Sequence, residues 1–376
     1  MKILLVVKNF DFGGAENHVC ELANELVENG EQVWLFSGSG RQIKRLSPKV
    51  VYLPAKISDW NMVPLLFRLL LLIRKEQIEL LHAHQRLPIW LATLAGLFTG
   101  TRVAGTVHGT ASHDIRSGFV KKYLDGIIVI SRNSYDIHSR NPKLSNKLYF
   151  LPNFFKIPVS PESKKNLSPA FNLFYVSRQD QRHANLLTDI ILNVWPRFLM
   201  KHPGSTFHLV GDGCGSEKIG RILGNHHAPP WVDSIVCEGY VDEVSSSLSN
   251  AHLVMGVGRV VGESLSIGIP ALSIKWNHLG PIVTRDNFEE LSYSNFVSLE
   301  ASPPVPDRLL AILDEFMDHS AYYREEAIAL SATVAKKFDI RNGIFQTLDV
   351  YHQLINSSKG STSHHPHSAL TEPPLS

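Results

Sequence analysis

Short aliphatic runs alternate with helix-length amphipathic segments along the first half of the chain. Such runs, bounded by turn residues, are typical of strands buried on both faces. Between the first two runs, apolar residues recur at helical spacing, and Gly30 stands where a helix end needs a cap. This alternation predicts a parallel sheet covered by helices. The predicted strands are 3–7, 33–37, 50–53, 78–82, 102–107, 126–130 and 147–151.

The alternation stops at 155–170, where Pro, Ser and Lys give the composition of an exposed connector, and then restarts. We therefore expect two Rossmann-like domains, each an open α/β sheet, joined by a linker. A final helix follows, and the pattern leaves open whether it returns to the first domain. The tail is rich in Ser, His and Pro, which predicts disorder. The expected boundaries are 1–154, linker 155–170, 171–336, helix 337–356 and tail 357–376. Strands are predicted at 172–176, 206–210, 235–238, 252–256 and 271–274, and helices at 306–318, 321–336 and 340–355.

Composition narrows the class of protein. The 376 residues suffice for two domains, and 44% hydrophobic against 19% charged residues excludes a disordered chain. A formal charge of +2 is too small for a dedicated nucleic-acid binder. Three scattered cysteines favour a reducing compartment. The leucine-rich segment 65–75 is too short to span a bilayer, but its basic residues allow two hypotheses, a helix lying on anionic lipid or one packed on the sheet.

Ligands of open α/β sheets bind where strands end and helices begin, so candidate residues are sought at those turns. The first turn contains Gly13 and Gly14, which allow close approach of an anion to the free amides of the following helix, with Glu16 in its first turn. The dinucleotide pattern G-x-G-x-x-G is absent from this turn. A purely structural turn remains the alternative.

Three histidines follow predicted strands of the first sheet. His82 and His84 come after the fourth strand, and His108 comes after the fifth, so all three are expected at the edge facing the ligand. Two histidines spaced i, i+2 can bind zinc, but no third ligand stands at a suitable spacing. The alternative is a structural role, which fits His82 and His84 better than His108, because Gly109 and Thr110 leave the latter accessible.

Turns of the second half carry basic residues and glycines. Arg178, Arg182 and His183 follow the first strand there, and guanidinium groups match diphosphate oxygens. The turn 256–262 is rich in glycine and precedes Glu263, whose carboxylate could accept hydrogen bonds from both ribose hydroxyls. Together these turns predict a nucleoside-diphosphate site. Two weaker alternatives are a dinucleotide loop at 211–216 and a hydrolase elbow at 262–266, each with serine where glycine is required.

The order and spacing of these motifs resemble family 4 glycosyltransferases of the GT-B fold, over about residues 1–355. The matching pieces are Gly13-Gly14-Ala15-Glu16, His82-Ala83-His84, Thr106-Val107-His108-Gly109, Val129-Ile130-Ser131, Pro152-Asn153, Ser177-Arg178, Leu209-Val210-Gly211-Asp212-Gly213, Gly239-Tyr240-Val241 and Gly262-Glu263-Ser264-Leu265-Ser266-Ile267-Gly268-Ile269-Pro270.

The resemblance implies two Rossmann-like domains with parallel sheets facing a central cleft. It implies a retaining transferase that uses a nucleotide-sugar, with UDP or GDP as the nucleotide, and no metal. Arg178, with Arg182 or His183, would neutralise the leaving diphosphate, and His108 would lie at the sugar and acceptor. Donor-binding positions implied in this way are Gly13, Gly14, Gly211, Gly213, Gly258, Arg259 and Glu263; acceptor-side positions are Glu16, His82 and His84.

One departure concerns Met255. Family members carry a glutamate eight positions before the one matched by Glu263, whereas this chain has Met255 there and reads G-R-x-x-x-E from Gly258. Recognition of the sugar must therefore differ, and the base, sugar and acceptor stay open. We expect a glycosyltransferase of cell-surface polysaccharide or lipopolysaccharide assembly, in the cytoplasm or at the inner face of the membrane. The alternatives are a nucleotide-sugar epimerase of the same fold and a catalytically silent binding subunit.

Overall fold

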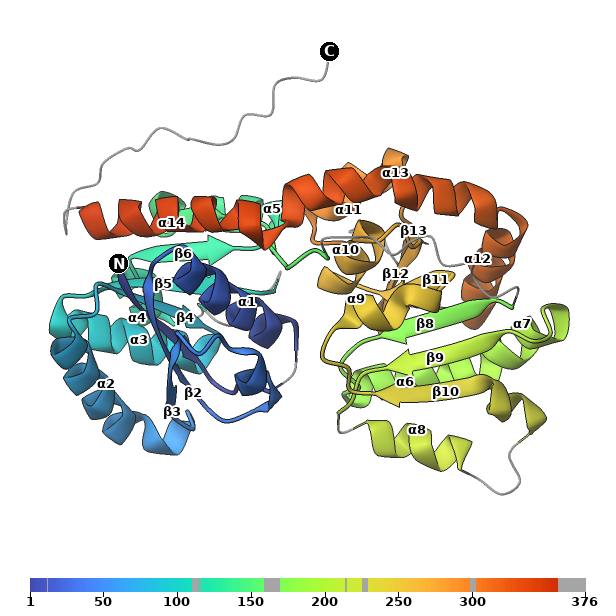
Figure 1. Cartoon of the computed structure of the whole chain (residues 1–376), viewed down its shortest axis with the longest axis horizontal. Coiled ribbons are helices and arrows are strands. Elements are labelled where there is room, and N and C mark those ends of the chain that lie inside the picture. Colours follow the sequence, from blue (N-terminus) through green and yellow to red (C-terminus); the bar gives the residue numbers. More distant parts are fainter. Residues whose placement is uncertain are drawn as a thin grey trace, which may run out of the picture.

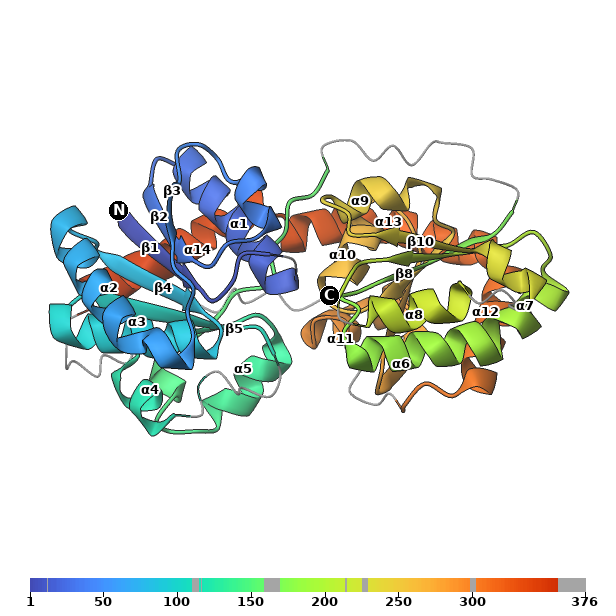
Figure 2. The same ribbon diagram turned by 90° about the horizontal axis from the view of Figure 1, so that it is seen from below.

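The computed structural model describes residues 1–11, 13–109, 115, 117–158, 170–213, 215–224, 229–297 and 302–357. Most of the predicted linker and the tail beyond Ser357 therefore lie outside the described residues. Every predicted strand is present, with ends shifted by no more than two residues. Figure 1 and Figure 2 show the two sheets side by side, each with helices on both faces.

The first sheet is entirely parallel, in the order β3-β2-β1-β4-β5-β6-β7. Its strands are β1 (Lys2–Val7), β2 (Gln32–Ser37), β3 (Val51–Pro54), β4 (Leu80–His84), β5 (Arg102–Val107), β6 (Gly126–Val129) and β7 (Leu148–Phe150). Its helices are α1 (Gly14–Glu28), α2 (Met62–Glu76), α3 (Arg86–Thr99), α4 (Gly118–Tyr123) and α5 (Arg132–Ser139).

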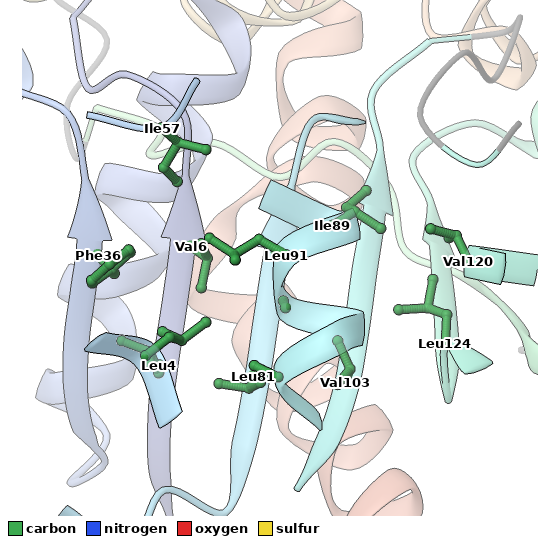
Figure 3. Packing of buried hydrophobic residues seen from close by; sticks show 14 of the residues in the cluster. Leu4, Val6, Phe36, Ile57, Leu81, Ile89, Leu91, Val103, Val120 and Leu124 are labelled. Atoms are coloured by element: carbon green, nitrogen blue, oxygen red, sulfur yellow. The ribbon is translucent and has the colours of Figure 1, made fainter. Parts of the chain in front are cut away.

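Alternate residues of β1 build two separate cores, because successive side chains of a strand point to opposite faces. Leu4 and Val6 pack with residues of α2 and α3 (Figure 3). Ile3, Leu5 and Val7 pack on the other face, with residues of α1 and of the C-terminal helix. The strand is therefore buried on both faces, as its unbroken apolar run predicts.

The second sheet has the order β10-β9-β8-β11-β12-β13. Its strands are β8 (Asn172–Val176), β9 (Thr206–Val210), β10 (Ile235–Gly239), β11 (Leu253–Gly256), β12 (Ala271–Lys275) and β13 (His278–Ile282). Its helices are α6 (Gln181–Asp189), α7 (Trp195–Lys201), α8 (Ser216–Leu223), α9 (Val244–Ser247), α10 (Arg259–Ser266), α11 (Arg285–Tyr293), α12 (Pro306–Asp318) and α13 (Ser320–Phe338). Strand β13 was not predicted. It pairs antiparallel with β12 at the sheet edge, where a strand tolerates its Gly280 and Pro281.

The last helix, α14 (Ile340–Asn356), returns to the first domain and packs on α1 and β5. Figure 1 shows α13 along the second domain and α14 along the first. The two places where the chain passes between the domains, at Phe155 and at 338–340, are hydrogen-bonded to each other. The Phe155 N–H donates to the Phe338 carbonyl at 2.9 Å, and the Ile340 N–H donates to the Phe155 carbonyl at 3.0 Å. The rings of Phe155 and Phe338 stack beside this pair.

The fit of α14 depends on Gly343. A methyl group there would lie 2.3 Å from the ring of Phe154, so Gly343→Ala should lower the free energy of unfolding by about 1–3 kcal/mol, measured by urea titration. The control is Gly220→Ala in α8, where nothing lies within 4 Å of the added methyl group. Alanine is the better helix former, so the control should be neutral or slightly stabilising. Equal effects of the two changes would contradict this account of the packing.

Candidate active site

Arg178 of the second domain reaches the first glycine turn of the first domain. Its Nη2 lies 3.6 Å from Glu16 Oε2, and a Cβ on Gly13 would stand 2.2 Å from Nη2 and 2.4 Å from Oε2. Gly13 also has a φ of 149°, which side-chain-bearing residues rarely adopt. A residue with a side chain would therefore be strained at this position. Gly14, the first residue of α1, has open space around its α-carbon.

Glycines on the neighbouring loop support the loop that carries Arg178. A Cβ on Gly211 would lie 1.9 Å from the Ser177 carbonyl oxygen, and one on Gly213 would lie 2.5 Å from the Gln179 carbonyl oxygen. The turns after β8 and β9 are therefore in backbone contact. This contact explains both glycines structurally, and their donor-binding role stays a prediction.

The two other basic candidates lie at Trp276, which follows β12. The Arg182 guanidinium is 5.3 Å from the centre of the indole ring, and the His183 ring packs against the same indole edge-on. His183 Nδ1 is also 2.7 Å from the Tyr175 hydroxyl. Burial lowers the pKa of His183, which disfavours a cation there. Of the two candidates, Arg182 is the one that carries a charge at neutral pH.

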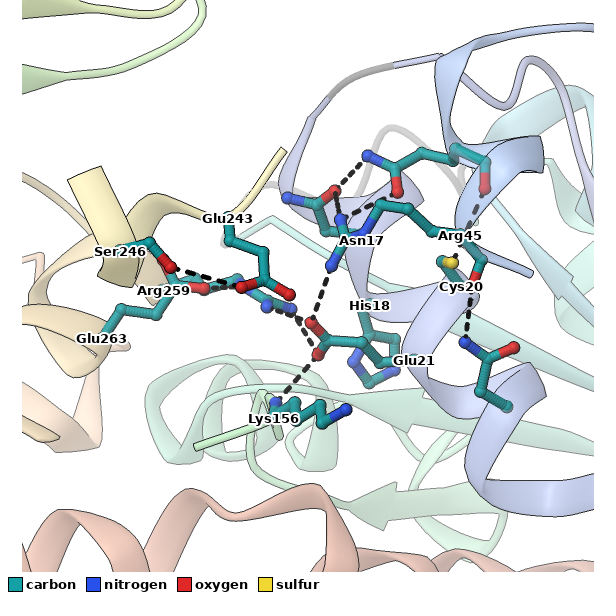
Figure 4. Close-up of polar contacts among 12 residues, drawn as sticks. Asn17, His18, Cys20, Glu21, Arg45, Lys156, Glu243, Ser246, Arg259 and Glu263 are labelled. Atoms are coloured by element: carbon teal, nitrogen blue, oxygen red, sulfur yellow. Dashed lines mark hydrogen bonds and ion pairs between the residues drawn. The ribbon is translucent and has the colours of Figure 1, made fainter. Parts of the chain in front are cut away.

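Arg259 joins the two domains through carboxylates on both sides (Figure 4). It is the first residue of α10, and it follows Gly258, whose φ is 62°. Its Nε donates to Glu263 Oε1 at 2.6 Å, and its Nη1 donates to Glu21 Oε2 of α1 at 2.8 Å, with Nη2 on the other Glu21 oxygen. Glu21 also accepts from the Lys156 N–H at 2.9 Å. The sequence did not single out Glu21, since a glutamate in a helix usually faces solvent.

Burial and pairing act differently on these charges. Burial opposes ionisation of Glu21, but Arg259 outweighs it and holds the pKa of Glu21 below its usual value. The pKa of Glu263 is raised by burial, and Arg259 compensates only in part. The two carboxylates raise the pKa of Arg259 although burial alone would lower it, so the guanidinium stays charged. One oxygen of Glu263 is thus already bound to Arg259 at the position expected to contact ribose.

The three predicted histidines lie together, and His18 of α1 joins them. His82 and His84 lie inside β4 rather than after it, and both are buried. His84 Nδ1 is 3.0 Å from His108 Nε2, and the His18 ring centre is 5.6 Å from that of His108. His82 is held by the Tyr351 hydroxyl at 2.6 Å and the Thr106 hydroxyl at 2.7 Å. The sequence analysis did not select His18; its position one turn beyond Gly14 is the signal that could have indicated it.

Burial keeps this histidine cluster, His18, His82, His84 and His108, uncharged. It lowers the pKa of His82 and of His108 to about 3, and that of His84 well below the usual value. Within the described ranges, no three or more His, Cys, Asp or Glu side chains are arranged to hold a metal ion. The cluster can therefore offer neutral hydrogen-bonding groups at the edge of the first sheet.

A comparison with protein families matches residues 12–156 to the family described as Glycosyltransferase Family 4. Residues 12–156 form a glycosyltransferase family 4 domain. The chain therefore contains a glycosyltransferase domain, and its two sheets have the GT-B fold that the sequence predicted. No curated protein sequence matches the chain.

Solved structures share the fold of this glycosyltransferase at low sequence identity. Anabaena HepE in complex with UDP is 17% identical, with a TM-score of 0.70 over 94% of this chain and 100% of that one. Sucrose-phosphate synthase from Thermosynechococcus elongatus is 15% identical, with a TM-score of 0.69 over 95% and 100%. A protein assigned as UDP-N-acetylglucosamine 2-epimerase from Listeria monocytogenes is 11% identical, with a TM-score of 0.60 over 93% and 96%. HepE was also solved with UDP-glucose.

The lowered pKa values predict acid sensitivity of the glycosyltransferase. In the unfolded chain, His82 and His108 bind protons below about pH 6.5. In the folded chain, the same histidines bind protons only near pH 3. The free energy of unfolding should therefore fall as pH is lowered through this window, by as much as about 1.4 kcal/mol per pH unit and histidine. Urea titrations at several pH values measure this slope.

His82→Gln tests the assignment of the slope to the cluster. This variant should be less stable at pH 7.5, yet its free energy of unfolding should depend less steeply on pH, because one fewer histidine binds its proton only in the unfolded chain. The control is His352→Gln on the exposed face of α14, which should keep the wild-type slope. An unchanged slope in His82→Gln would contradict the assignment.

Proposed function

We propose that the chain is a retaining glycosyltransferase that moves a sugar from a UDP-linked donor to a glycan or a lipid-linked acceptor in cell-surface polysaccharide or lipopolysaccharide assembly. The observation that carries this proposal is the position of Arg178, whose guanidinium lies over Gly13 where the two domains meet. The complexes of HepE with UDP support the choice of uridine. The acceptor and its pathway rest on the motif resemblance alone.

In the proposed reaction, Arg178 stabilises the leaving diphosphate. Negative charge grows on the phosphate oxygens as the bond to the anomeric carbon breaks, and a guanidinium already in place lowers the energy of that state. The amide groups at the start of α1 lie beside Gly13 and add donors for the same charge. The acceptor hydroxyl attacks from the face that the diphosphate leaves, and its proton passes to a departing phosphate oxygen. We propose that these residues perform this role without a metal ion.

Arg178→Ala tests the proposal directly. Loss of a charge-assisted contact worth about 1.5–3 kcal/mol should weaken binding of UDP about 10- to 100-fold, measured by calorimetry. The matched control is Arg197→Ala on α7, whose guanidinium pairs with Asp307 instead and which should bind UDP as the wild type does. Unchanged affinity for UDP in Arg178→Ala would overturn the assignment of Arg178 to the diphosphate.

Activity that survives a metal chelator would agree with the metal-free mechanism.

The likeness to the Listeria protein assigned as an epimerase supports one competing function. An epimerase converts its nucleotide-sugar without an acceptor, so a new sugar isomer would appear on the nucleotide. A glycosyltransferase instead releases UDP and forms a glycoside. A chain that binds UDP and yields neither product would be the silent subunit.

We further propose that the first domain contacts an anionic membrane surface at the inner face of the cell membrane. Val63, Phe67 and Leu71 form a stripe along α2 with exposed fractions of 66%, 63% and 68%, and Trp60 precedes them at 98%. Residues 1–154 carry 19 Lys and Arg against 12 Asp and Glu, whereas 155–376 carry 18 against 23. Among the described helices, none is long and apolar enough to cross a membrane. An apolar stripe on a basic domain suits the surface of an anionic bilayer.

The double variant Phe67→Ser/Leu71→Ser should bind vesicles containing phosphatidylglycerol at least about tenfold more weakly, because each buried CH₂ contributes about 0.8 kcal/mol. Cosedimentation measures this binding, and vesicles of pure phosphatidylcholine give the charge-independent background. Met200→Ser, at an exposed apolar position of the second domain, serves as the control and should bind like the wild type. Equal binding by all three proteins would refute the contact.

A further inference from the structure

The carboxylate of Glu16 is buried with only one of its oxygens satisfied. Its side chain is 7% exposed, and Oε1 accepts a hydrogen bond from Gln85 Nε2 at 2.8 Å. In the part of the chain that the structure describes, Oε2 has no hydrogen-bond partner. Among the described residues, the ion-pair partner of Oε2 is Arg178, at 3.6 Å, too far for a hydrogen bond. Buried acceptors are normally satisfied, and leaving one bare is costly, so this oxygen needs an explanation.

A strained residue holds Glu16 in this state. Gln85 follows β4 at the N-cap of α3 and has a φ of 71°, one of few positive values at residues other than glycine in the described chain. Its side-chain oxygen accepts from the Lys8 N–H at 3.3 Å, while its amide group donates to Glu16. Strained backbone of this kind persists where the surrounding structure enforces it, often at binding sites. Gln85 thereby fixes which oxygen of Glu16 stays bare.

The backbone of Gly13 lies against the bare oxygen. A Cβ at that position would lie 2.4 Å from Oε2, so a side chain there would clash with it. The Arg178 guanidinium from the other domain lies against the same glycine, with Nη2 2.2 Å from that Cβ position. A cation and an unsatisfied carboxylate oxygen therefore stand side by side, one suited to a phosphate and the other to a hydroxyl group.

A nucleotide-sugar presents these two groups next to each other, because its sugar ring is attached directly to the diphosphate. Met255, where the motif leads one to expect a glutamate, is fully buried in β11 and has no hydrogen-bonding oxygen in its side chain. Any carboxylate that contacts the sugar therefore comes from elsewhere in the chain. Glu16 lies against the residue assigned to the diphosphate, although the sequence had placed it on the acceptor side.

We propose that Glu16 Oε2 accepts a hydrogen bond from a hydroxyl group of the transferred sugar and so selects the donor. This inference rests on the proposed function, since it takes Arg178 as the diphosphate site. The contact comes from the first domain, whereas Arg178, which is assigned to the diphosphate, belongs to the second. Selection of the sugar therefore requires both domains to be in place, and UDP alone does not use this contact.

Burial raises the pKa of Glu16, while a hydrogen bond from its own backbone N–H, the charge of Arg178 and the hydrogen bond from Gln85 oppose the shift. Acid therefore neutralises this carboxylate more readily than an exposed glutamate. Asp11 is the other charged group that acts on this carboxylate, and its negative charge adds to the rise in pKa. As pH falls, the gain in affinity that the sugar adds to UDP should shrink before binding of UDP itself is lost.

The test compares Glu16→Gln with the control Glu28→Gln, an exposed position of the same helix. Calorimetric titrations use UDP and then UDP-glucose, UDP-galactose, UDP-N-acetylglucosamine and GDP-mannose. In Glu16→Gln, the conjugate that the wild type prefers should bind about 10- to 100-fold more weakly. Binding of UDP should be unchanged or tighter, because a negative charge beside Arg178 is gone. The control should match the wild type throughout.

Thermal unfolding separates this role from a structural one. Neutralising a buried carboxylate with an unsatisfied oxygen should leave the melting temperature of Glu16→Gln unchanged or raise it. A lower melting temperature together with weaker binding of UDP would mean that Glu16 only supports the fold, and would overturn the inference. Unchanged preference among conjugates would overturn it as well and leave the proposed function standing. A wild-type protein that binds no conjugate would overturn both. Glu16→Asp, which keeps the charge but retracts the oxygen, should also lose sugar preference.

Discussion

The buried guanidinium of Arg259 ties the two domains together, and the geometry of the site depends on it. Its partners come from both sides, Glu21 on α1 and Glu263 on α10. Removing one member of such a group leaves a buried charge uncompensated, which typically costs about 3–5 kcal/mol. Through this contact α1 is held against the second domain. The same helix carries Glu16, so the spacing between Glu16 and Arg178 follows from the pairing at Glu21.

Helix α1 thus presents two carboxylates, five residues apart, to two arginines of the other domain. The contact at Glu21 is closed, with both oxygens bound, whereas the contact at Glu16 leaves one oxygen bare. The contact at Glu21 suits a structural link between the domains. The contact at Glu16 suits a position where a ligand completes the hydrogen bonding. Arg41 with Asp212 and Gln42 with Tyr240 add weaker polar contacts across the same junction.

Periodicity was sufficient to predict the strands, because parallel strands buried on both faces appear as continuous apolar runs. It failed for β13, whose Gly280 and Pro281 look like a turn and are accommodated at an edge. Residue type was sufficient to select the arginines at strand ends as candidate site residues, but it did not predict which carboxylates pair with them. Glu21 looks like any surface glutamate, and His183 looks like a second phosphate ligand until its bond to Tyr175 is seen. Tertiary pairing of this kind has no local pattern in a sequence.

The return of α14 has a consequence for biosynthesis. The cover over one face of the first sheet comes from residues 340–356, whereas the sheet itself is complete by Phe150. All seven strands of the first sheet are therefore synthesised before α14, which covers Leu5 and the other residues of one face. The whole second domain is synthesised in between. At roughly 5–20 residues per second, the interval is on the order of ten seconds or more. The nascent first domain must remain in a partly uncovered form for that time.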